Sequence, residues 1–202
     1  MAASERENHP ASRTKRIFIA LGVGCAIALF ATAIALAFGT TSPNATILSP
    51  SVAGRPVGAR LPVDFELARL GGGRRVDLSR LVEKRVAVIN VFASWCPACE
   101  KELDAFGKVS REFRQSVAFV GVDSSEPNPR RSEALLEAAH AHYPVGLDTT
   151  DLTVADSWGV TNLPVTFFLR ANGTIAAEHL GAESPNALRR EVRRLIGAAG
   201  RV

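Results

Sequence analysis

The sequence predicts an α/β fold, a central mixed β-sheet flanked by helices, with an extra amino-terminal β-hairpin and one transmembrane helix before it. Residues 17–38 form an uncharged apolar segment of membrane-spanning length. Apolar strand-length runs at 86–93 and 117–122 alternate with helical patterns. Two more strands flank an Asn172-Gly173 turn. A strand–helix–strand unit followed by this hairpin and a helix gives a mixed sheet with helices on both faces.

The apolar segment 17–38 reads IFIALGVGCAIALFATAIALAF. At 1.5 Å per residue, a helix of this length covers about 33 Å, enough to cross the hydrocarbon of a bilayer. The flank before it carries Arg6, Arg13, Lys15 and Arg16. Because residues 39–54 are uncharged, we expect 1–16 to be a cytoplasmic tail, and the chain after 38 to be extracytoplasmic. A cleaved signal peptide is the alternative, but its apolar region is usually only about 7–15 residues.

Residues 39–60 are rich in Ser, Thr, Pro, Ala and Gly, and predict a linker between the membrane and a domain at 61–202. Acidic and basic residues nearly balance after Phe38, so we expect no nucleic-acid partner. Four arginines at helical spacing indicate a solvated helix face. They are Arg189, Arg190, Arg193 and Arg194.

The domain begins with a predicted hairpin. Apolar and polar residues alternate over 63–68, which indicates a strand, and Gly71–Gly73 turn the chain. The stretch RRVDL at 74–78 is then expected to return as a second strand. The other expected elements are a strand at 86–93, a helix at 97–113, a strand at 117–122, a helix at 126–142, a short helix at 151–158, strands at 165–170 and 174–180, and a final helix that Ser184 caps and Pro185 begins.

Cys96 and Cys99 bracket Pro-Ala in the stretch NVFASWCPACEKE. A structural zinc site needs about four ligands, and the histidines of the domain lie far along the chain. A structural disulfide is also disfavoured, because closing so short a loop restrains the unfolded chain little. No metal site is therefore expected. Cys25 belongs to the apolar segment and is interpreted as a small residue of a membrane helix.

Redox chemistry fits the pair better. Cys96 falls where the buried strand gives way to a helix, and the free N–H groups and the dipole there favour a nucleophilic thiolate. Pro97 suits the first helical turn because it has no N–H to lose. Cys99 lies one turn inward, where it can resolve a mixed disulfide on Cys96. A Cys-x-x-Cys motif after a strand in an α/β pattern indicates a thioredoxin-like site.

The stretch VAVINVFASWCPACEKEL resembles the active-site strand and helix of thioredoxin-fold proteins. More narrowly, it is similar to the TlpA/ResA family, membrane-tethered disulfide reductases of bacterial cytochrome c maturation. The resemblance extends over about 61–195, and YPVGLDTTDLTVADSWGVTNLPVTFFLRANGTI matches the second half of the family. It implies a thioredoxin-like fold with a redox-active Cys96–Cys99 disulfide and no further cofactor.

The resemblance also carries over to Pro164 and Glu102. Pro164 matches a cis-proline that would lie opposite the sulfurs and expose the backbone of Leu163 to an extended substrate; an ordinary trans-proline is the alternative. Glu102 matches an acidic residue three positions beyond the second Cys. It lies about 60° around the helix from Cys99, at the edge of the apolar stripe. If buried, it suits proton exchange with Cys99; if exposed at the margin of the stripe, it does not. Trp95 and Pro97 are expected to contact the substrate.

These observations predict a thiol:disulfide oxidoreductase in the cell membrane, single-pass, with its catalytic domain outside. Cys96 would be the nucleophile, Cys99 the resolving thiol and Glu102 the proton carrier. The resemblance implies that it works as a reductant, with apocytochrome c as substrate and a membrane electron donor of the CcdA/DsbD type as partner. A thiol oxidase that introduces disulfides into exported proteins is the alternative, and a copper-binding protein on the same fold is a more distant one.

Overall fold

The computed structural model describes residues 55–149 and 151–200. The predicted tail 1–16 and membrane helix 17–38 lie outside these residues, as does most of the linker. In the described part, no helix has both the length and the apolarity needed to cross a membrane.

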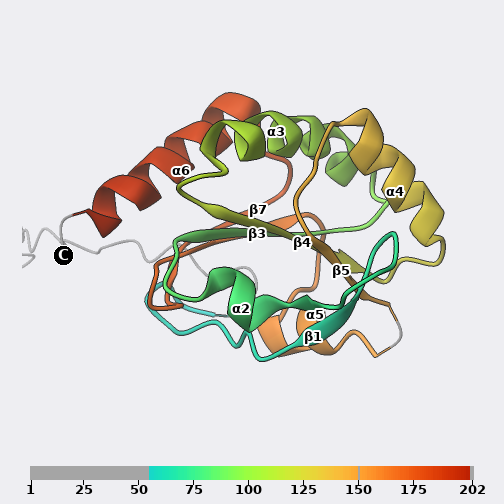
Figure 1. Ribbon diagram of the computed structural model, residues 1–202, viewed down its shortest axis with the longest axis horizontal. Helices are drawn as coiled ribbons and strands as arrows, with labels where there is room; N and C mark the ends of the chain where they lie inside the picture. The colour runs from blue at the N-terminus through green and yellow to red at the C-terminus, as the bar shows by residue number, and fades with distance from the viewer. Residues whose placement is uncertain (1–54, 150, 201–202) are drawn as a thin grey trace, which may run out of the picture. The chain divides into compact units, whose positions relative to one another are not determined.

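A mixed sheet forms the centre of the domain (Figure 1), and its strand order is β2-β1-β5-β4-β3-β6-β7. The strands are β1 (Glu66–Arg69), β2 (Val76–Asp77), β3 (Ala87–Phe92), β4 (Ala118–Ser124), β5 (Val145–Asp148), β6 (Val165–Leu169) and β7 (Ile175–Leu180). The three central strands β5, β4 and β3 run parallel to one another, and the pairs towards both edges are antiparallel. The mixed sheet and both hairpins were predicted from the sequence.

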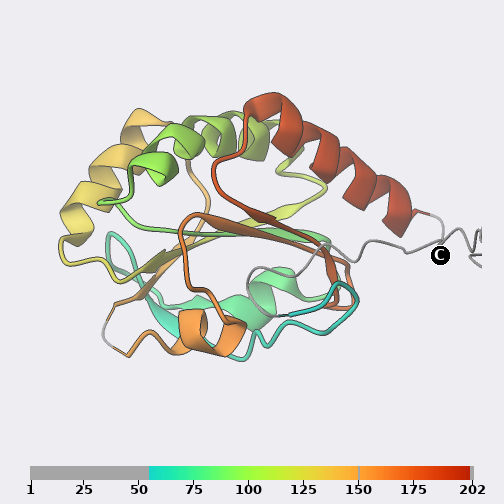
Figure 2. The same cartoon turned by 180° about the vertical axis from the view of Figure 1, so that it is seen from behind.

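Helices cover both faces of the sheet. They are α2 (Leu78–Val82), α3 (Pro97–Phe113), α4 (Pro129–Ala138), α5 (Thr153–Trp158) and α6 (Pro185–Ala199). Helices α3, α4 and α6 lie over one face, and α2 and α5 lie over the other, as Figure 1 and, from behind, Figure 2 show. The two faces are called here the α3 face and the α5 face.

The pleat of β3 divides its side chains between the two faces. Ala87, Ile89 and Val91 pack into the cluster that holds α2 and α5, whereas Val88 packs against α3 and α6. Phe92 packs against the amino-terminal part of α3. The alternation therefore puts Asn90, the polar residue of this strand, on the α3 face.

Two elements escaped the sequence analysis, α2 and β5. Of the predicted strand at 74–78, only Val76–Asp77 is confirmed, and 74–75 are not part of a strand. After Asp77 the prediction is wrong because the Asp77 carboxylate accepts a hydrogen bond from the Arg80 N–H and caps a short helix. Strand β5 has four residues and includes Gly146, so no alternation marks it. The glycine is needed, since a Cβ there would lie 2.6 Å from Leu67 on the neighbouring β1.

The predicted helix at 126–142 is too long at both ends. Helix α4 begins at Pro129, because Glu126 is occupied in hydrogen bonds before it. It ends at Ala138, and His140 takes a left-handed φ of 51° that no helix can continue.

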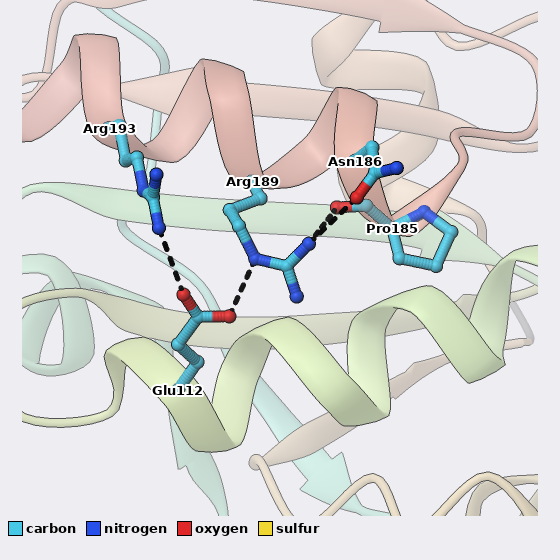
Figure 3. Close-up of polar contacts among 5 residues, drawn as sticks. All are labelled: Glu112, Pro185, Asn186, Arg189 and Arg193. Carbon is cyan, nitrogen blue, oxygen red and sulfur yellow. Dashed lines mark hydrogen bonds and ion pairs between the residues drawn. The ribbon is translucent and has the colours of Figure 1, made fainter.

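Two of the four clustered arginines join α6 to α3 (Figure 3). Arg189 Nε lies 2.7 Å from Glu112 Oε2, and Arg193 Nη2 lies 3.5 Å from Glu112 Oε1. Arg189 also donates to Asn186 Oδ1 at 3.0 Å within α6. Exposed ion pairs contribute at most about 1 kcal/mol. The buried residues Leu188 and Val192 therefore contribute most to docking α6, and the arginines fix its register on α3.

The last residues of the predicted linker run along the edge strand β7. Gly58 N–H donates to Ile175 O at 2.8 Å, and Arg60 forms an antiparallel bridge with Thr174. Arg55 already contacts the domain, since its Nε and Nη2 donate to Ser157 O at 3.1 and 2.7 Å, so the whole described end of the linker is attached.

Candidate functional site

The two cysteines lie where β3 ends and α3 begins. Cys96 is the N-cap of α3, with an extended backbone, and its Sγ accepts a hydrogen bond from the Cys99 N–H at 3.1 Å. Pro97 occupies the first turn of the helix. The two sulfurs form a disulfide, and their Cα atoms are 5.2 Å apart. Cys96 is 5% exposed and Cys99 is 0% exposed, so a partner can approach Cys96 first.

A surface pocket of about 480 Å³ opens beside Cys96. Its lining includes Trp95, Pro97 and Leu163, which the sequence analysis expected to contact the substrate. Trp95 is 48% exposed, and its Nε1 donates to Ser125 O at 2.9 Å, which holds the indole beside the pocket. The pocket is therefore bordered by an aromatic side chain, a sulfur and the loop before β6.

The Leu163–Pro164 peptide bond is cis. Leu163 packs against the buried cluster that contains both cysteines, and Pro164 O accepts a hydrogen bond from Gly181 N–H at 2.9 Å. Pro164 itself is not among the residues that line the pocket. Leu163, the residue before it, lines the pocket instead.

Glu102 is buried, with an exposed fraction of 1%. Asn90 Nδ2 donates to its Oε2 at 3.0 Å, and the backbone N–H of Glu183 donates to its Oε1 at 3.1 Å. Burial raises the pKa of Glu102 to about 7; the charge of Glu183 adds to this rise, and the hydrogen bonds partly offset it. The alternative of an exposed Glu102 is therefore wrong, and its proton-carrier role stays a prediction.

The structure brings a second acidic group to this region, which the sequence analysis missed. Asp123 lies at the end of β4, opposite Phe92 in the ladder, and is fully buried. Neither of its carboxyl oxygens has a hydrogen-bond partner at the usual distance and angle, although the Ser132 hydroxyl lies near enough to oppose a rise in the pKa. Burial raises its pKa to about 7, and the charge of Glu126 adds to the rise. A charged residue ending the apolar run VAFVGVD was the signal that could have revealed it.

Glu126 forms a hydrogen bond with the loop that precedes Cys96. Its Oε2 accepts hydrogen bonds from the Ser94 N–H at 2.7 Å and the Ser132 hydroxyl at 3.1 Å, and its Oε1 accepts one from the Asn128 N–H at 2.7 Å. Burial favours a higher pKa for Glu126, but these hydrogen bonds together outweigh it and lower the pKa. Glu126 thus ties the β3–α3 loop to the β4–α4 loop.

Two further buried groups surround Glu102. Glu183 is 5% exposed, and burial raises its pKa to about 7. Tyr143, the only tyrosine of the chain, stacks edge-on against Phe106 of α3. Its hydroxyl is buried without a partner, and burial, helped by the charge of Glu102, raises its pKa. No sequence pattern could connect these residues, because tertiary packing alone brings them together.

The chemistry available here is thiol–disulfide exchange. The Cys96 sulfur at the N-cap of α3, which is slightly exposed, and the fully buried Cys99 sulfur form one reactive pair. The buried carboxyl groups in this region can hold protons near neutral pH. Across 55–149 and 151–200, no three His, Cys, Asp or Glu side chains are grouped as ligands of a metal ion would be.

A central mixed sheet, a disulfide at the start of the helix after β3 and a cis-proline before β6 define a thioredoxin-like thiol–disulfide oxidoreductase. Residues 57–178 match the model of the AhpC/TSA family, and the chain belongs to that family. The TlpA/ResA resemblance is confirmed by relatives that are named thiol-disulfide oxidoreductases or interchange proteins.

Two curated relatives illustrate the similarity. The thiol:disulfide interchange protein DsbE of Allochromatium vinosum is 27% identical over 182 residues, which cover 90% of this chain and 93% of the relative. The thiol-disulfide oxidoreductase ResA of Bacillus subtilis is 32% identical over 104 residues, which cover 51% of this chain and 56% of the relative.

Among solved structures, the fold matches a secreted Mycobacterium tuberculosis disulfide oxidoreductase homologous to E. coli DsbE. The TM-score is 0.60 at 23% identity, and the match covers 66% of this chain and 97% of the other. This likeness shows the thioredoxin-like fold.

Proposed function

We propose that this chain is a membrane-anchored, extracytoplasmic disulfide reductase that reduces the haem-attachment cysteines of apocytochrome c. The reductant role is supported above all by the buried carboxyl of Glu102 on the turn of α3 that follows Cys99. Its partners are the Asn90 amide, the Thr166 hydroxyl and a backbone N–H, all of them neutral. An ionised carboxylate there disfavours a thiolate on Cys99, and so disfavours the reduced state of the pair. A pair whose reduced state is disfavoured gives its electrons away readily.

The reaction proceeds through two exchanges. The Cys96 thiolate attacks a substrate disulfide, forms a mixed disulfide and releases one substrate thiolate, which takes up a proton. Cys99 then gives its proton to Glu102 and attacks Cys96 Sγ, which breaks the mixed disulfide and releases the second substrate sulfur. The substrate gains two electrons and two protons, and Cys96 and Cys99 become the disulfide.

The pocket beside Cys96 fits an extended peptide. Trp95 offers an exposed aromatic surface, and Leu163, the residue before the cis-proline, lines the same pocket as Cys96. The substrate segment would be Cys-x-x-Cys-His, the haem-attachment motif of c-type cytochromes. A membrane donor of the CcdA/DsbD type would supply the electrons, because the outside face is oxidising.

The reduction potential of the full chain tests the direction of electron flow. Equilibration with thiol buffers should give a value more negative than about −200 mV, as glutaredoxins and thioredoxin have. A value near about −120 mV, typical of a strong oxidant, would overturn the reductant role and favour the oxidase that forms disulfides in exported proteins.

The substrate is tested separately by trapping. Replacement of Cys99 by Ala leaves the mixed disulfide on Cys96 unresolved, and apocytochrome c should be recovered linked to Cys96 in cells. Recovery of exported proteins without a haem motif, and of no apocytochrome, would contradict the proposed substrate.

A further inference from the structure

Glu183 lies in the short segment between β7 and α6, directly before the N-cap Ser184. Two backbone hydrogen bonds fix this segment against the site. Gly181 N–H donates to Pro164 O at 2.9 Å, and Glu183 N–H donates to Glu102 Oε1 at 3.1 Å. The segment therefore joins the cis-proline loop to the buried acid of α3, although Glu183 and Glu102 are 81 positions apart in the chain.

The two carboxyls are both enclosed, with residue exposures of 1% for Glu102 and 5% for Glu183. Glu183 Oε1 is buried without a hydrogen-bond partner. Two neighbouring carboxylates in such a medium do not ionise independently, because the first charge makes the second more costly.

Several ionisable groups lie around the carboxyls of Glu102 and Glu183. Helix α3 contributes Cys99, the segment before β5 contributes Tyr143, and α6 contributes Arg190 and Glu191, which act on Glu183 with opposite signs. His179 on β7 lies across from Thr166 on the same face of the sheet and is exposed. Glu183 therefore has one cation on α6 near it, while the contacts of Glu102 are neutral groups.

We propose that Glu183 forms with Glu102 a coupled pair of carboxyls that accepts the proton released by Cys99. This inference rests on the proposed proton-carrier role of Glu102 and extends it. Glu183 is a positioning residue, because it acts on the thiols only through Glu102. When Glu183 is ionised, it makes Glu102 a stronger base.

In the mixed disulfide, the Cys99 thiol gives its proton to the Glu102 carboxylate. The Cys99 sulfur bonds to Cys96 Sγ, and the bond between Cys96 and the substrate sulfur breaks with its electron pair on the substrate. The substrate thiolate takes a proton from water. The proton held by the carboxyl pair returns to solvent after the product has left.

The rate of this resolving step tests the inference. The reduced full chain with Cys25 replaced by Ser is mixed in detergent with 5,5′-dithiobis(2-nitrobenzoate), and the second thionitrobenzoate released reports the attack of Cys99 on the mixed disulfide. The rate is measured between pH 5 and 9 for the wild type, Glu183→Gln, Glu102→Gln and the double variant. Asp104→Asn is the matched control, because Asp104 lies on the exposed side of α3.

Glu183→Gln keeps the backbone N–H that Glu102 accepts and removes the charge. Its pH midpoint should therefore move down by about one pH unit, while Asp104→Asn keeps the wild-type midpoint. Glu102→Gln should remove the neutral transition, and the double variant should match Glu102→Gln. A Glu183→Gln profile that superimposes on the wild type would overturn the inference, and so would a midpoint shift that persists without Glu102.

Failure of the proposed function gives different results. A chain that forms no mixed disulfide is no oxidoreductase, and a Glu102→Gln profile identical to the wild type ends the proton-carrier role itself.

A second measurement needs no variant: the carboxyl ¹³C shifts of Glu102 and Glu183 are followed with pH. Two-step titration of both carbons supports coupling, and two independent single-step curves contradict it.

Discussion

The two faces of the central sheet differ in how completely their buried acidic groups are hydrogen-bonded. On the α5 face, the acidic residue Asp148 accepts hydrogen bonds from the N–H groups of Val154 and Ala155 at the start of α5, at 3.2 and 2.9 Å. On the α3 face, Asp123 and Glu183 are buried with carboxyl oxygens that have no partner. Every buried side-chain polar atom that lacks a partner in the described part of the chain lies on or beside this second face. These atoms belong to Asn90, Ser94, Asp123, Tyr143 and Glu183.

This difference separates stability from chemistry. A buried polar group without a partner destabilises the folded state by about 1–3 kcal/mol, so the unpaired groups of the α3 face lower the free energy of unfolding. The α5 face is a packed apolar cluster in which Trp158 contacts Phe65 and Phe167 edge-on. We infer that the α5 face contributes packing alone, while the α3 face combines packing with buried groups that hold protons next to the thiols.

The largest expected effect is the loss of activity when Cys96 is replaced by Ser. A serine hydroxyl is not ionised at neutral pH, so disulfide exchange should fall by at least about 1,000-fold, as followed by insulin reduction. Cys25→Ser is the matched control and should keep full activity, because Cys25 lies in the predicted membrane segment. Activity that survives Cys96→Ser but is lost in Cys25→Ser would refute the assignment of the nucleophile.

Trp158→Ala tests the α5 face. The indole is fully buried, and its Nε1 donates to Pro62 O at 2.6 Å, so we expect a loss of about 3–5 kcal/mol in the free energy of unfolding. The pH profile of thiol exchange should be unchanged wherever the variant is folded. A shifted profile, or a loss below about 1 kcal/mol, would break the separation between the two faces.

Glu102→Gln tests the α3 face, where we expect a loss of activity without a loss of stability. The resolving step should slow about 100-fold at pH 7, since a positioned acid–base group contributes at least that much. Stability should be unchanged or higher, because a buried ionisable group is removed. A variant with wild-type rates and reduced stability would make Glu102 a structural residue.

The smallest expected effect is on the pH dependence of stability. The pKa values of Glu102, Asp123 and Glu183 are raised to about 7 in the folded chain, so the folded chain binds more protons than the unfolded chain between about pH 4.5 and 7. Their contribution is thus fully present below the unfolded pKa and is lost as the pH rises through about 7. Urea unfolding should therefore show a free energy of unfolding that is lower at pH 8 than at pH 5. An increase over this interval would contradict the burial of these groups.

Local patterns predicted the reactive pair and most of the fold. Cys96 and Cys99 follow a buried strand directly, and Ser184 and Pro185 mark the start of α6 by their own chemistry. Strand β5 could not be predicted, because four residues including a glycine carry no periodicity.

The proton-holding groups around the thiols were harder to predict, because nothing local reveals their contacts. Glu102 could be placed beside Cys99 by helical geometry, but its burial depends on Asn90 in β3 and on the segment before α6. Glu183 is a polar residue in a loop by every sequence criterion. Its burial and the contact of its N–H with Glu102 arise only from tertiary packing.

The most direct test is the pH dependence of Cys96 alkylation in the full chain with Cys99 replaced by Ala and Cys25 by Ser. Because Cys96 caps α3, half of it should be ionised at least one pH unit below about 8.5, the value for a free cysteine. A midpoint at about 8.5 would show that the helix does not activate this sulfur, and the account of the site would fail.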